Sequence, residues 1–427
     1  MILSQETVNT YVEILKEELV PAMGCTEPIA IAYSASILRK VLGSFPEKVS
    51  IGLSGNIIKN VKSVIVPATG GMHGIKAAVS AGIIAGCPEK KLEVLSVLTE
   101  SDRVKISDFS NNNEIDIYEI QTEKPFEIVI EGSSDSGYAR IRLADRHTNV
   151  ISVIKDGNDL TDEFLSNEDV HICETADRSL LNVKDIITFA DEIDLERLRY
   201  LIKRQIEMNL AIAREGLSGS YGASIGKLLL ETTEDNPRNR ARAYTAAGSD
   251  ARMNGCELPV SIISGSGNQG ITSCVPVAIY AEAVGANEDK LIRAVIVSDL
   301  ITIHQKTGIG CLSAYCGAIS AGCGCGCGIC YLNGGRFYEI AHTLVNSVAI
   351  LSGTICDGAK ASCAAKIAMA VEAGIMGYEM AISGRQFYGG DGIVTKGVEN
   401  TIRNVGKLAR DGMSETDREI IRIMLEG

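Results

Sequence analysis

The chain lacks an excess of positive charge. Its 427 residues include 41 Lys and Arg against 54 Asp and Glu, which gives a formal net charge of −13 at pH 7. Nucleic acids and anionic membrane surfaces bind proteins through basic faces. This balance argues against both as partners, and we expect the ligand to be a small molecule.

Long apolar segments are also missing. No stretch approaches the roughly 20 uninterrupted apolar residues that a membrane-spanning helix needs. The first 20 residues alternate apolar and acidic side chains at helical spacing, and they lack the basic region and apolar core of a signal peptide. We therefore expect a cytoplasmic protein.

Common nucleotide and cofactor signatures are absent as well. The Gly-rich run at 264–270 is not followed by the Lys-Ser/Thr of a Walker motif, and no strand with a later acidic residue completes a dinucleotide fingerprint. No pyridoxal-phosphate pattern surrounds Lys76, Lys227 or Lys360, although inspection alone leaves them open as Schiff-base lysines.

Cysteine is abundant, and eight of the 13 cysteines lie between residues 306 and 370. In a chain without an export signal, this density indicates metal or redox chemistry before disulfides. Four of the eight, Cys323, Cys325, Cys327 and Cys330, lie in a dense run with glycine. For the first three we favour burial as small apolar side chains over metal binding.

The other cysteines of this region are widely spaced along the chain. Cys356 and Cys363 are seven residues apart, so they share a face if the segment is helical, and a turn at 357–358 brings them together if it is not. A third thiol from Cys316 would complete a three-cysteine site, which leaves one iron of a [4Fe-4S] cluster open for substrate. From spacing alone, buried structural thiols are an equally good interpretation.

A further cysteine precedes an expected helix. Cys25 lies in the run GCTEP, and Pro28 suits the first turn of a helix over 29–42. Backbone N–H groups at a helix N-terminus favour an anion, so we expect a reactive thiolate there, with a packed loop thiol as the alternative. His73 is a second candidate base, although a His in a Gly-rich turn more often serves the turn.

The Gly-rich turn at 264–270 runs into a helix and can present backbone N–H groups to an anion. An amino-acid carboxylate fits this site as well as a phosphate does, and a purely structural turn is equally compatible. The candidate substrate-binding side chains are Ser266, Asn268, Gln269 and, beside Cys25, Thr26.

Four motifs resemble one family. GCTEP at 24–28, SDARMNG at 249–255, SGSGNQGIT at 264–272 and ICDGAKASCA at 355–364 are together similar to the L-cysteine desulfidases, relatives of the iron-sulfur L-serine dehydratases. The motifs span nearly the whole chain. The serine dehydratases match more weakly, because GCTEP stands where they have a Ser-His-Thr run.

The resemblance implies specific roles. In that family three cysteines hold a [4Fe-4S] cluster and an N-terminal cysteine is the proposed proton acceptor. Matched by motif, the cluster ligands are Cys316, Cys356 and Cys363, and the base is Cys25. Cys311 rivals Cys316 as the first ligand. The implied reaction is β-elimination from L-cysteine to sulfide, pyruvate and ammonia.

Pattern and length predict an α+β protein with two domains. Residues 1–183 are expected to hold the Cys25 loop and a mixed or antiparallel sheet with helices, and residues 184–427 an all-helical domain with the cluster cysteines and the Gly-rich loop. Strands are predicted at 49–55, 63–68, 92–98, 114–120, 126–132, 138–145 and 149–157. Helices are predicted at 4–20, 29–42, 184–217, 223–232, 238–253, 272–284, 289–302, 338–352, 362–373 and 415–425.

Two alternatives stay open at this stage. One is an L-serine or related amino-acid dehydratase of the same cluster type. The other is a thiol-rich protein that binds soft metals at the dense cysteine run without catalysis. The sequence is also compatible with a homo-oligomer.

Overall fold

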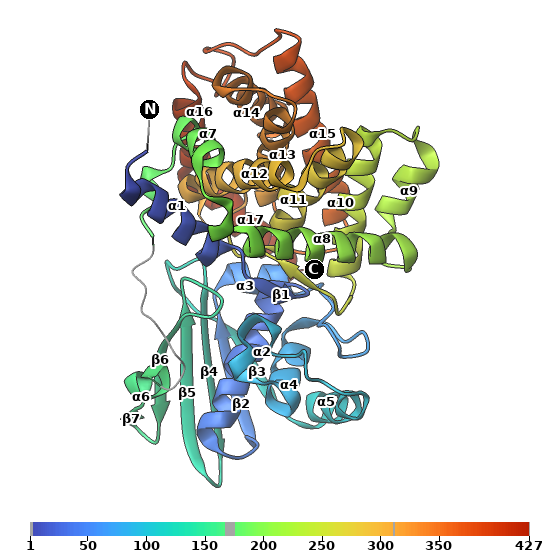
Figure 1. Ribbon diagram of the computed structural model, residues 1–427. Coiled ribbons are helices and arrows are strands. Elements are labelled where there is room, and N and C mark those ends of the chain that lie inside the picture. Colours follow the sequence, from blue (N-terminus) through green and yellow to red (C-terminus); the bar gives the residue numbers. More distant parts are fainter. Residues whose placement is uncertain (1–2, 167–175, 311, 427) are drawn as a thin grey trace.

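The computed structural model describes residues 3–166, 176–310 and 312–426. A sheet with its helices forms one part of the molecule, and a bundle of helices forms the other (Figure 1). This arrangement confirms the predicted α+β class with a largely helical C-terminal region. The predicted division into two domains at residue 183 stays a prediction. Among the described residues, no helix is both long and apolar enough to cross a membrane.

The main sheet has the strand order β3-β2-β4-β5-β6-β7, in which β2 and β3 run parallel and the other neighbours antiparallel. Side chains of β5 alternate: Ala139, Ile141 and Leu143 are buried, whereas Arg140 pairs across the strands with Glu131 on the other face. The strands are β2 (Lys48–Leu53), β3 (Ile115–Glu119), β4 (Glu127–Ser134), β5 (Gly137–Ala144), β6 (Val150–Lys155) and β7 (Asn158–Asp159).

Helix α2 covers the apolar face of this sheet through β4 and β5, and α4 packs on α2. Two predicted strands are wrong. Residues 63–68 make only an isolated bridge from Ile65 to His73, and residues 92–98 begin in the 3₁₀ turn at Pro88–Glu93 and continue as turns. Val64, Val66, Val94 and Leu95 are fully buried, and short apolar runs do not separate strands from buried turns. The helices of this part are α2 (Thr26–Leu42), α3 (Gly55–Val61), α4 (Gly74–Ala85), α5 (Glu100–Asn112) and α6 (Thr161–Ser166).

The helical part is built around α13, which contacts α11, α12, α14 and α15. The first helix of the chain, α1 (Gln5–Glu18), also contacts this part, since the hydroxyl of Tyr11 donates to the carbonyl of Leu180 at 2.8 Å. The other helices are α7 (Val183–Glu192), α8 (Arg199–Ser218), α9 (Ile225–Thr232), α10 (Pro237–Met253), α11 (Gly267–Ala283), α12 (Glu288–Ile309), α13 (Gly317–Leu332), α14 (Phe337–Leu351), α15 (Cys363–Ile382), α16 (Val398–Lys407) and α17 (Ser414–Glu426).

Helix α13 contains the dense cysteine run, for which no helix was predicted. Glycine disfavours helices, but here it allows close helix packing. A Cβ on Gly326 would lie 2.4 Å from the carbonyl oxygen of Gly374 on α15, and one on Gly324 would lie 2.5 Å from that of Ser298 on α12. The four cysteines of this run, Cys323, Cys325, Cys327 and Cys330, are at most 2% exposed. Tertiary packing therefore outweighs local propensity in this segment.

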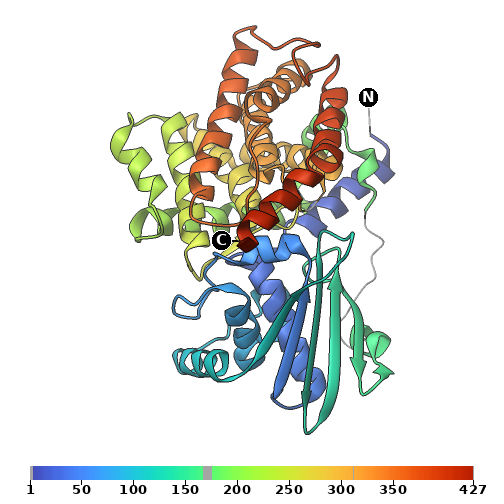
Figure 2. The same ribbon diagram turned by 180° about the vertical axis from the view of Figure 1, so that it is seen from behind.

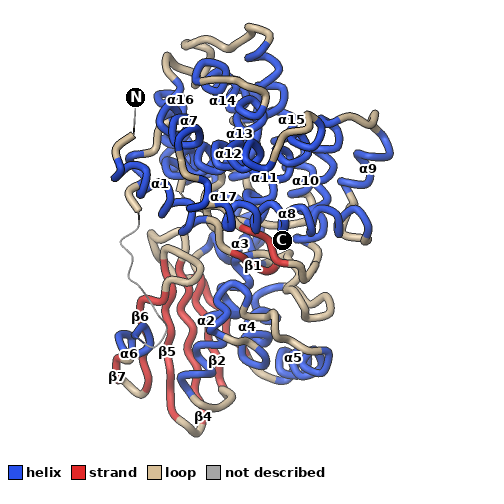
Figure 3. The backbone as a smooth tube through the Cα atoms, viewed as in Figure 1, coloured by secondary structure: helices blue, strands red, loops and turns tan. Residues whose placement is uncertain are grey.

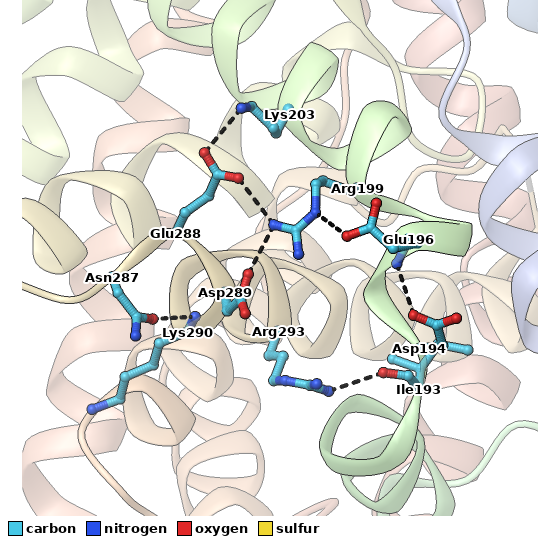
Figure 4. Close-up of polar contacts among 10 residues, drawn as sticks. All are labelled: Ile193, Asp194, Glu196, Arg199, Lys203, Asn287, Glu288, Asp289, Lys290 and Arg293. Carbon is cyan, nitrogen blue, oxygen red and sulfur yellow. Dashed lines mark hydrogen bonds and ion pairs between the residues drawn. The ribbon is translucent and has the colours of Figure 1, made fainter.

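The predicted helix at 184–217 is broken into α7 and α8 by a 3₁₀ turn at Leu195–Arg197. Arg199, the first residue of α8, makes ion pairs with Glu196 and with Glu288 and Asp289 in the first turn of α12 (Figure 4). These contacts place the start of α8 beside the start of α12.

A short two-stranded sheet joins the two parts of the molecule. Strand β1 (Pro21–Met23) pairs antiparallel with β8 (Pro259–Ser261), with Pro21 opposite Ser261 (Figure 3). On the far side, α17 contacts α3 near the same junction (Figure 2). There the ammonium of Lys59 lies 2.5 Å from a carboxylate oxygen of Asp417.

Candidate functional site

A cavity of about 110 Å³ lies where the two parts of the molecule meet. One ordered water needs about 10–15 Å³ by this measure, so the cavity has room for several waters or a small ligand. All eight residues selected from the sequence line it: Cys25, Thr26, Ser266, Asn268, Gln269, Cys316, Cys356 and Cys363. Residues almost 340 positions apart in the chain therefore share one site.

The β1–β8 pairing positions the first half of the site. Cys25 follows β1 by two residues and is the N-cap of α2, and Ser266 follows β8 and is the N-cap of α11. The hydroxyl of Thr26 donates to the carbonyl of Gly265 at 2.8 Å, which ties the two loops together. Gly265 has a φ of +76°, a conformation that glycine adopts without strain. The GCTEP loop and the Gly-rich turn are thus direct neighbours.

A second bridge positions the other cysteines. Tyr315 and Ile355 form an isolated antiparallel bridge, which brings the segments that carry Cys316 and Cys356 side by side, with Cys316 opposite Thr354 and Cys356 opposite Ala314. The N–H of Cys356 donates to the carbonyl of Ala314 at 2.6 Å, and the N–H of Cys316 donates to the carbonyl of Thr354 at 3.2 Å.

Cys363 is the first residue of α15, whereas Cys356 lies before that helix. Of the two expected geometries, the structure has the turn and not the shared helix face. Gly358 in this turn has a φ of +95°, and a Cβ there would lie 2.5 Å from the carbonyl oxygen of Lys59. The turn thus packs directly on α3 and closes the cavity on that side.

Four helices begin at the cavity: α2, α11, α13 and α15. The N-caps of the first three are Cys25, Ser266 and Cys316, and none of their side chains caps its own helix. The first N–H groups of a helix have no intrahelical partner and carry a partial positive charge. The cavity therefore favours an anion.

Positive side chains strengthen this preference. The cavity is lined by Lys59, Arg252, Lys306 and Lys366, and Glu27 is the sole carboxylate among its described lining residues. Lys366 donates to the carbonyl of Ile355 at 2.9 Å, so its charge is held beside the turn between the cysteines. Lys59 also pairs with Asp417 and Lys366 with Asp357, so these carboxylates offset part of the positive charge at the cavity.

Several buried polar atoms at the cavity have no hydrogen-bond partner among the residues that the structure describes. They include Nε of Arg252, Oδ1 of Asn268, Oε1 of Gln269 and the hydroxyl of Tyr315. Unsatisfied buried groups are rare in proteins and call for a specific explanation. A bound polar ligand or water would supply the missing partners.

Burial sets the protonation state of the thiols at the cavity. It raises the pKa of Cys316 to about 12 and also raises the pKa of Cys363. Without a cation, such thiols keep their protons. A metal reverses this preference, because a coordinating thiol is deprotonated. Among the described residues, no three His, Cys, Asp or Glu side chains are close enough to hold a single metal ion. In a cubane cluster each thiolate binds a separate iron, so its ligands stand further apart.

The expected thiolate at Cys25 is wrong for the protein without a bound cluster or substrate. The residue is at a helix N-terminus, but it is 2% exposed, and burial together with the nearby carboxylate of Glu27 raises its pKa well above the usual value. Its thiol donates to Oε2 of Glu27 at 3.1 Å. Desolvation and a like charge thus outweigh the helix dipole.

Burial also opposes the charge on Glu27, but the neighbouring His147 and the hydrogen bond from Cys25 lower its pKa to about 2. The amide of Asn60 donates to Oε1 of Glu27 at 3.1 Å. Glu27 therefore carries its negative charge next to the Cys25 thiol at neutral pH.

Glu27, Asn60, Arg252 and the three lysines of the cavity were not predicted from the sequence. Glu27 and Arg252 lie inside the motifs GCTEP and SDARMNG, so the motifs pointed to them, although no role was assigned. Asn60, Lys59 and Lys306 lie in ordinary helical segments without a distinguishing pattern. Only the tertiary arrangement reveals them.

The remaining candidates lie elsewhere. His73 is exposed at the start of α4 and does not line this cavity, and neither do Lys76, Lys227 and Lys360. Cys311, the rival of Cys316, falls outside the described residues. The four cysteines of α13 face the helical core, where burial raises the pKa of each.

Comparison with known proteins places the chain in a family. Residues 89–422 match the model of the serine dehydratase alpha chain. A UPF0597 protein of Desulfitobacterium hafniense is 54% identical over 98% of this chain and 96% of its own length. A UPF0597 protein of Treponema denticola is 44% identical over the full length of both chains. The protein thus belongs to the serine dehydratase alpha chain family.

Proposed function

We propose that the protein is a [4Fe-4S]-dependent lyase that cleaves L-cysteine into sulfide, pyruvate and ammonia. The observation that carries this proposal is the meeting of Cys316, Cys356 and Cys363 with Cys25 at one cavity. The family relation supports a lyase or dehydratase, and the motifs of the chain favour cysteine as the substrate.

The residues around the cavity suit the proposed cluster. Cys316, Cys356 and Cys363 would hold it, and each is only partly buried, so its sulfur can be reached from the cavity. A cluster held by three thiolates carries negative charge. The N-termini of α13 and α15 and the ammonium of Lys366 offset that charge. When bound, the open iron would take the substrate's sulfur as a soft ligand and make it a better leaving group.

The chain's own side chains would bind the amino acid. The N-terminus of α11 presents N–H groups for its carboxylate. Arg252 adds a cation with an unpaired Nε, and Asn268 and Gln269 add amides with unpaired oxygens. Gly267 leaves room for Arg252, since a Cβ there would lie 2.3 Å from Nε. The amide oxygens would accept from the substrate's ammonium.

Cys25 would take the α-proton. It lines the same cavity as the cluster cysteines and is buried, so bulk water does not compete for the proton. Because its thiol is protonated in the protein alone, it must release that proton to Glu27 as it accepts the new one. Cys25 thus acts together with its carboxylate neighbour.

One observation favours a second candidate, the dehydration of L-serine. The family model that matches the chain is that of the serine dehydratase alpha chain. Serine would bring a hydroxyl to the iron in place of a thiol. The same carboxylate and proton-acceptor groups would serve both substrates.

Spectral titration of the anaerobically purified protein tests the proposal. We expect a brown protein with about four irons, whose visible spectrum changes on addition of L-cysteine at lower concentration than with L-serine. The Cys316→Ser variant is the control for specific cluster binding. A colourless protein that binds zinc or copper(I) in place of iron contradicts the proposal and favours a soft-metal binding protein.

A further inference from the structure

Cys25, Glu27 and His147 are successive neighbours, and His147 lies outside the lining of the cysteine cavity. The thiol of Cys25 donates to Oε2 of Glu27 at 3.1 Å, and the other oxygen, Oε1, lies 3.9 Å from Nε2 of His147. Cys25 and Glu27 come from the start of α2, whereas His147 comes from the turn between β5 and β6. The fold therefore brings an imidazole to a carboxylate 120 positions away in the sequence.

The ring of His147 is held in place on two sides. Phe126 packs against it edge to face, with ring centroids 4.8 Å apart. Gly265 makes room for it, since a Cβ there would lie 2.8 Å from Cε1. Nε2 is buried and has no hydrogen-bond partner. A fixed, buried imidazole nitrogen whose neighbour is the Glu27 carboxylate at 3.9 Å is available to exchange a proton with it.

His147 also borders a second cavity of about 410 Å³. Its lining includes the charged side chains of Glu17, Glu18, Arg146 and Arg178. A cavity of this size, lined in part by charged side chains, has room for several waters. The imidazole of His147 thus stands between Glu27 and a space suited to water, outside the cavity that contains the cysteines.

A buried Cys25 that accepts a proton from the substrate needs a route by which its own thiol proton can leave. Burial and Glu27 keep its thiol protonated, and the carboxylate of Glu27, whose pKa is about 2, holds a proton only briefly. Arg252 from α10, Lys59 from α3 and Lys306 from α12 line the same space. A proton that reaches Glu27 must therefore move on, and the imidazole of His147, with Nε2 3.9 Å from Oε1, is the neighbouring acceptor.

We propose that Glu27 and His147 form a proton relay that carries the proton released by Cys25 to the second cavity. This rests on the proposed function. The substrate's α C–H bond breaks, its electron pair forms the C=C bond, and the Cβ–S bond breaks so that sulfide leaves with that bond's electrons. The Cys25 sulfur takes the α-proton while its own proton passes to Glu27, then to His147, and from His147 to water. Both relay residues are positioning residues, since neither contacts the reacting atoms.

Steady-state kinetics of the holoenzyme provide the first test. We expect Glu27→Gln and His147→Ala to lower kcat by about 10²-fold, in the range for a proton-transfer group, with KM changed less than threefold. Added imidazole should restore His147→Ala through the second cavity, in proportion to the concentration of the unprotonated base. His73→Ala is the matched control, because His73 is exposed and outside both cavities. Its kcat should equal that of the wild type.

Infrared spectroscopy gives a readout without turnover. The difference between wild type and Cys25→Ala isolates the S–H stretch of Cys25. We expect this band at higher wavenumber in Glu27→Gln, because a neutral amide accepts a weaker hydrogen bond than a carboxylate does. An unchanged band overturns the relay at its first step.

The outcomes separate the relay from the proposed function. An active wild type whose His147→Ala variant keeps full kcat, with no response to imidazole, overturns the relay alone. A wild type that releases no product from either L-cysteine or L-serine overturns the proposed function.

Discussion

At the scale of single residues, surroundings decide the chemistry of each thiol. Cys25, Cys316 and Cys327 are all buried enough for their pKa values to be raised, but only the first two line the cavity. Cys327 instead donates weakly to the carbonyl of Ile340 inside the helical core. A cysteine-rich sequence thus contains two populations, and access to the cavity separates them.

The cluster cysteines should be separable from the core cysteines by substitution. We expect Cys316→Ser, Cys356→Ser and Cys363→Ser each to abolish the visible absorbance of the cluster, because a serine hydroxyl is a poor iron ligand. Cys325→Ser should leave the absorbance intact, since that thiol lies in the core of α13. The measurement is the visible spectrum and iron content after anaerobic purification. Bleaching by Cys325→Ser, with Cys316→Ser still coloured, would reverse the assignment.

Cys25 should have a role in turnover and not in cluster binding. We expect Cys25→Ala to keep the cluster absorbance and the fold while lowering turnover by about two to four orders of magnitude, the range for a positioned acid-base group. Cys25→Ser should be no better, because a hydroxyl is far less acidic than a thiol. Loss of the cluster absorbance in either variant would identify Cys25 as a ligand. Rapid exchange of the substrate's α-proton in the variant would place the base elsewhere.

At the scale of elements, the central helix α13 depends on glycine for its close contacts. Its neighbours α12 and α15 approach so closely that their backbone atoms occupy the space of a Cβ at Gly322, Gly324 and Gly326. The N-terminus of α13 carries Cys316, so the position of this helix sets the position of a proposed cluster ligand.

Gly326→Ala should therefore destabilise the protein. The new methyl would lie 2.4 Å from the carbonyl oxygen of Gly374, which is backbone and cannot rotate away. We expect a loss of about 1–3 kcal/mol in the free energy of unfolding, the usual cost of overpacking, measured by urea denaturation. Gly353→Ala is the control, since nothing lies within 4 Å of its Cβ position. Equal stability of the two variants would contradict the packing described for α13.

A buried carboxyl group between helices should make stability depend on pH. Asp299 of α12 accepts a hydrogen bond from Gln205 of α8 at 3.1 Å, but its Oδ2 has no partner, and burial raises its pKa from 3.8 to about 7. Between about pH 4 and 7 the folded protein holds a proton that the unfolded chain has lost. The stabilising contribution is complete below pH 4 and is lost as the pH rises to about 7.

Asp299→Asn should remove this dependence. We expect it to match the wild type near pH 4 and to exceed it at pH 8 by up to about 4 kcal/mol, at about 1.4 kcal/mol for each pKa unit. Urea denaturation at several pH values measures the difference. Asp108→Asn, at an exposed position of α5, should keep the wild-type dependence. An unchanged pH profile in Asp299→Asn would show that the group is ionised in the folded protein.

The sequence predicted the secondary-structure elements and the site to different extents. An amphipathic segment with a clear N-cap, such as α1 with Ser4, was found because its signals are local. Helix α13 was missed, since its stability comes from contacts with α12 and α15 that no local pattern reveals. Among the cavity residues that lie within motifs, Cys25, Cys356 and Cys363 were found, whereas Glu27 and Arg252 were given no role. Lys59 and His147 were not assigned roles, because only folding brings α3 and the β5–β6 turn to the site.

At the scale of the whole molecule, the site exists only where the two parts meet. The sheet part contributes Cys25, Glu27 and Lys59, and the helical part contributes the three proposed cluster ligands and the Gly-rich turn. The β1–β8 pairing and the contact of α3 with α17 hold the two parts together around it. Neither part contains the complete site.

The most direct test of this account is the release of products by the anaerobically purified protein. Sulfide and pyruvate are measured after addition of L-cysteine, and pyruvate alone after addition of L-serine, with Cys316→Ser as the inactive control. The account predicts equal amounts of sulfide and pyruvate from L-cysteine, at a kcat/KM well above that for L-serine. Pyruvate from L-serine with no sulfide from L-cysteine would contradict the assigned substrate. Absence of both products from an iron-loaded protein would contradict the central claim.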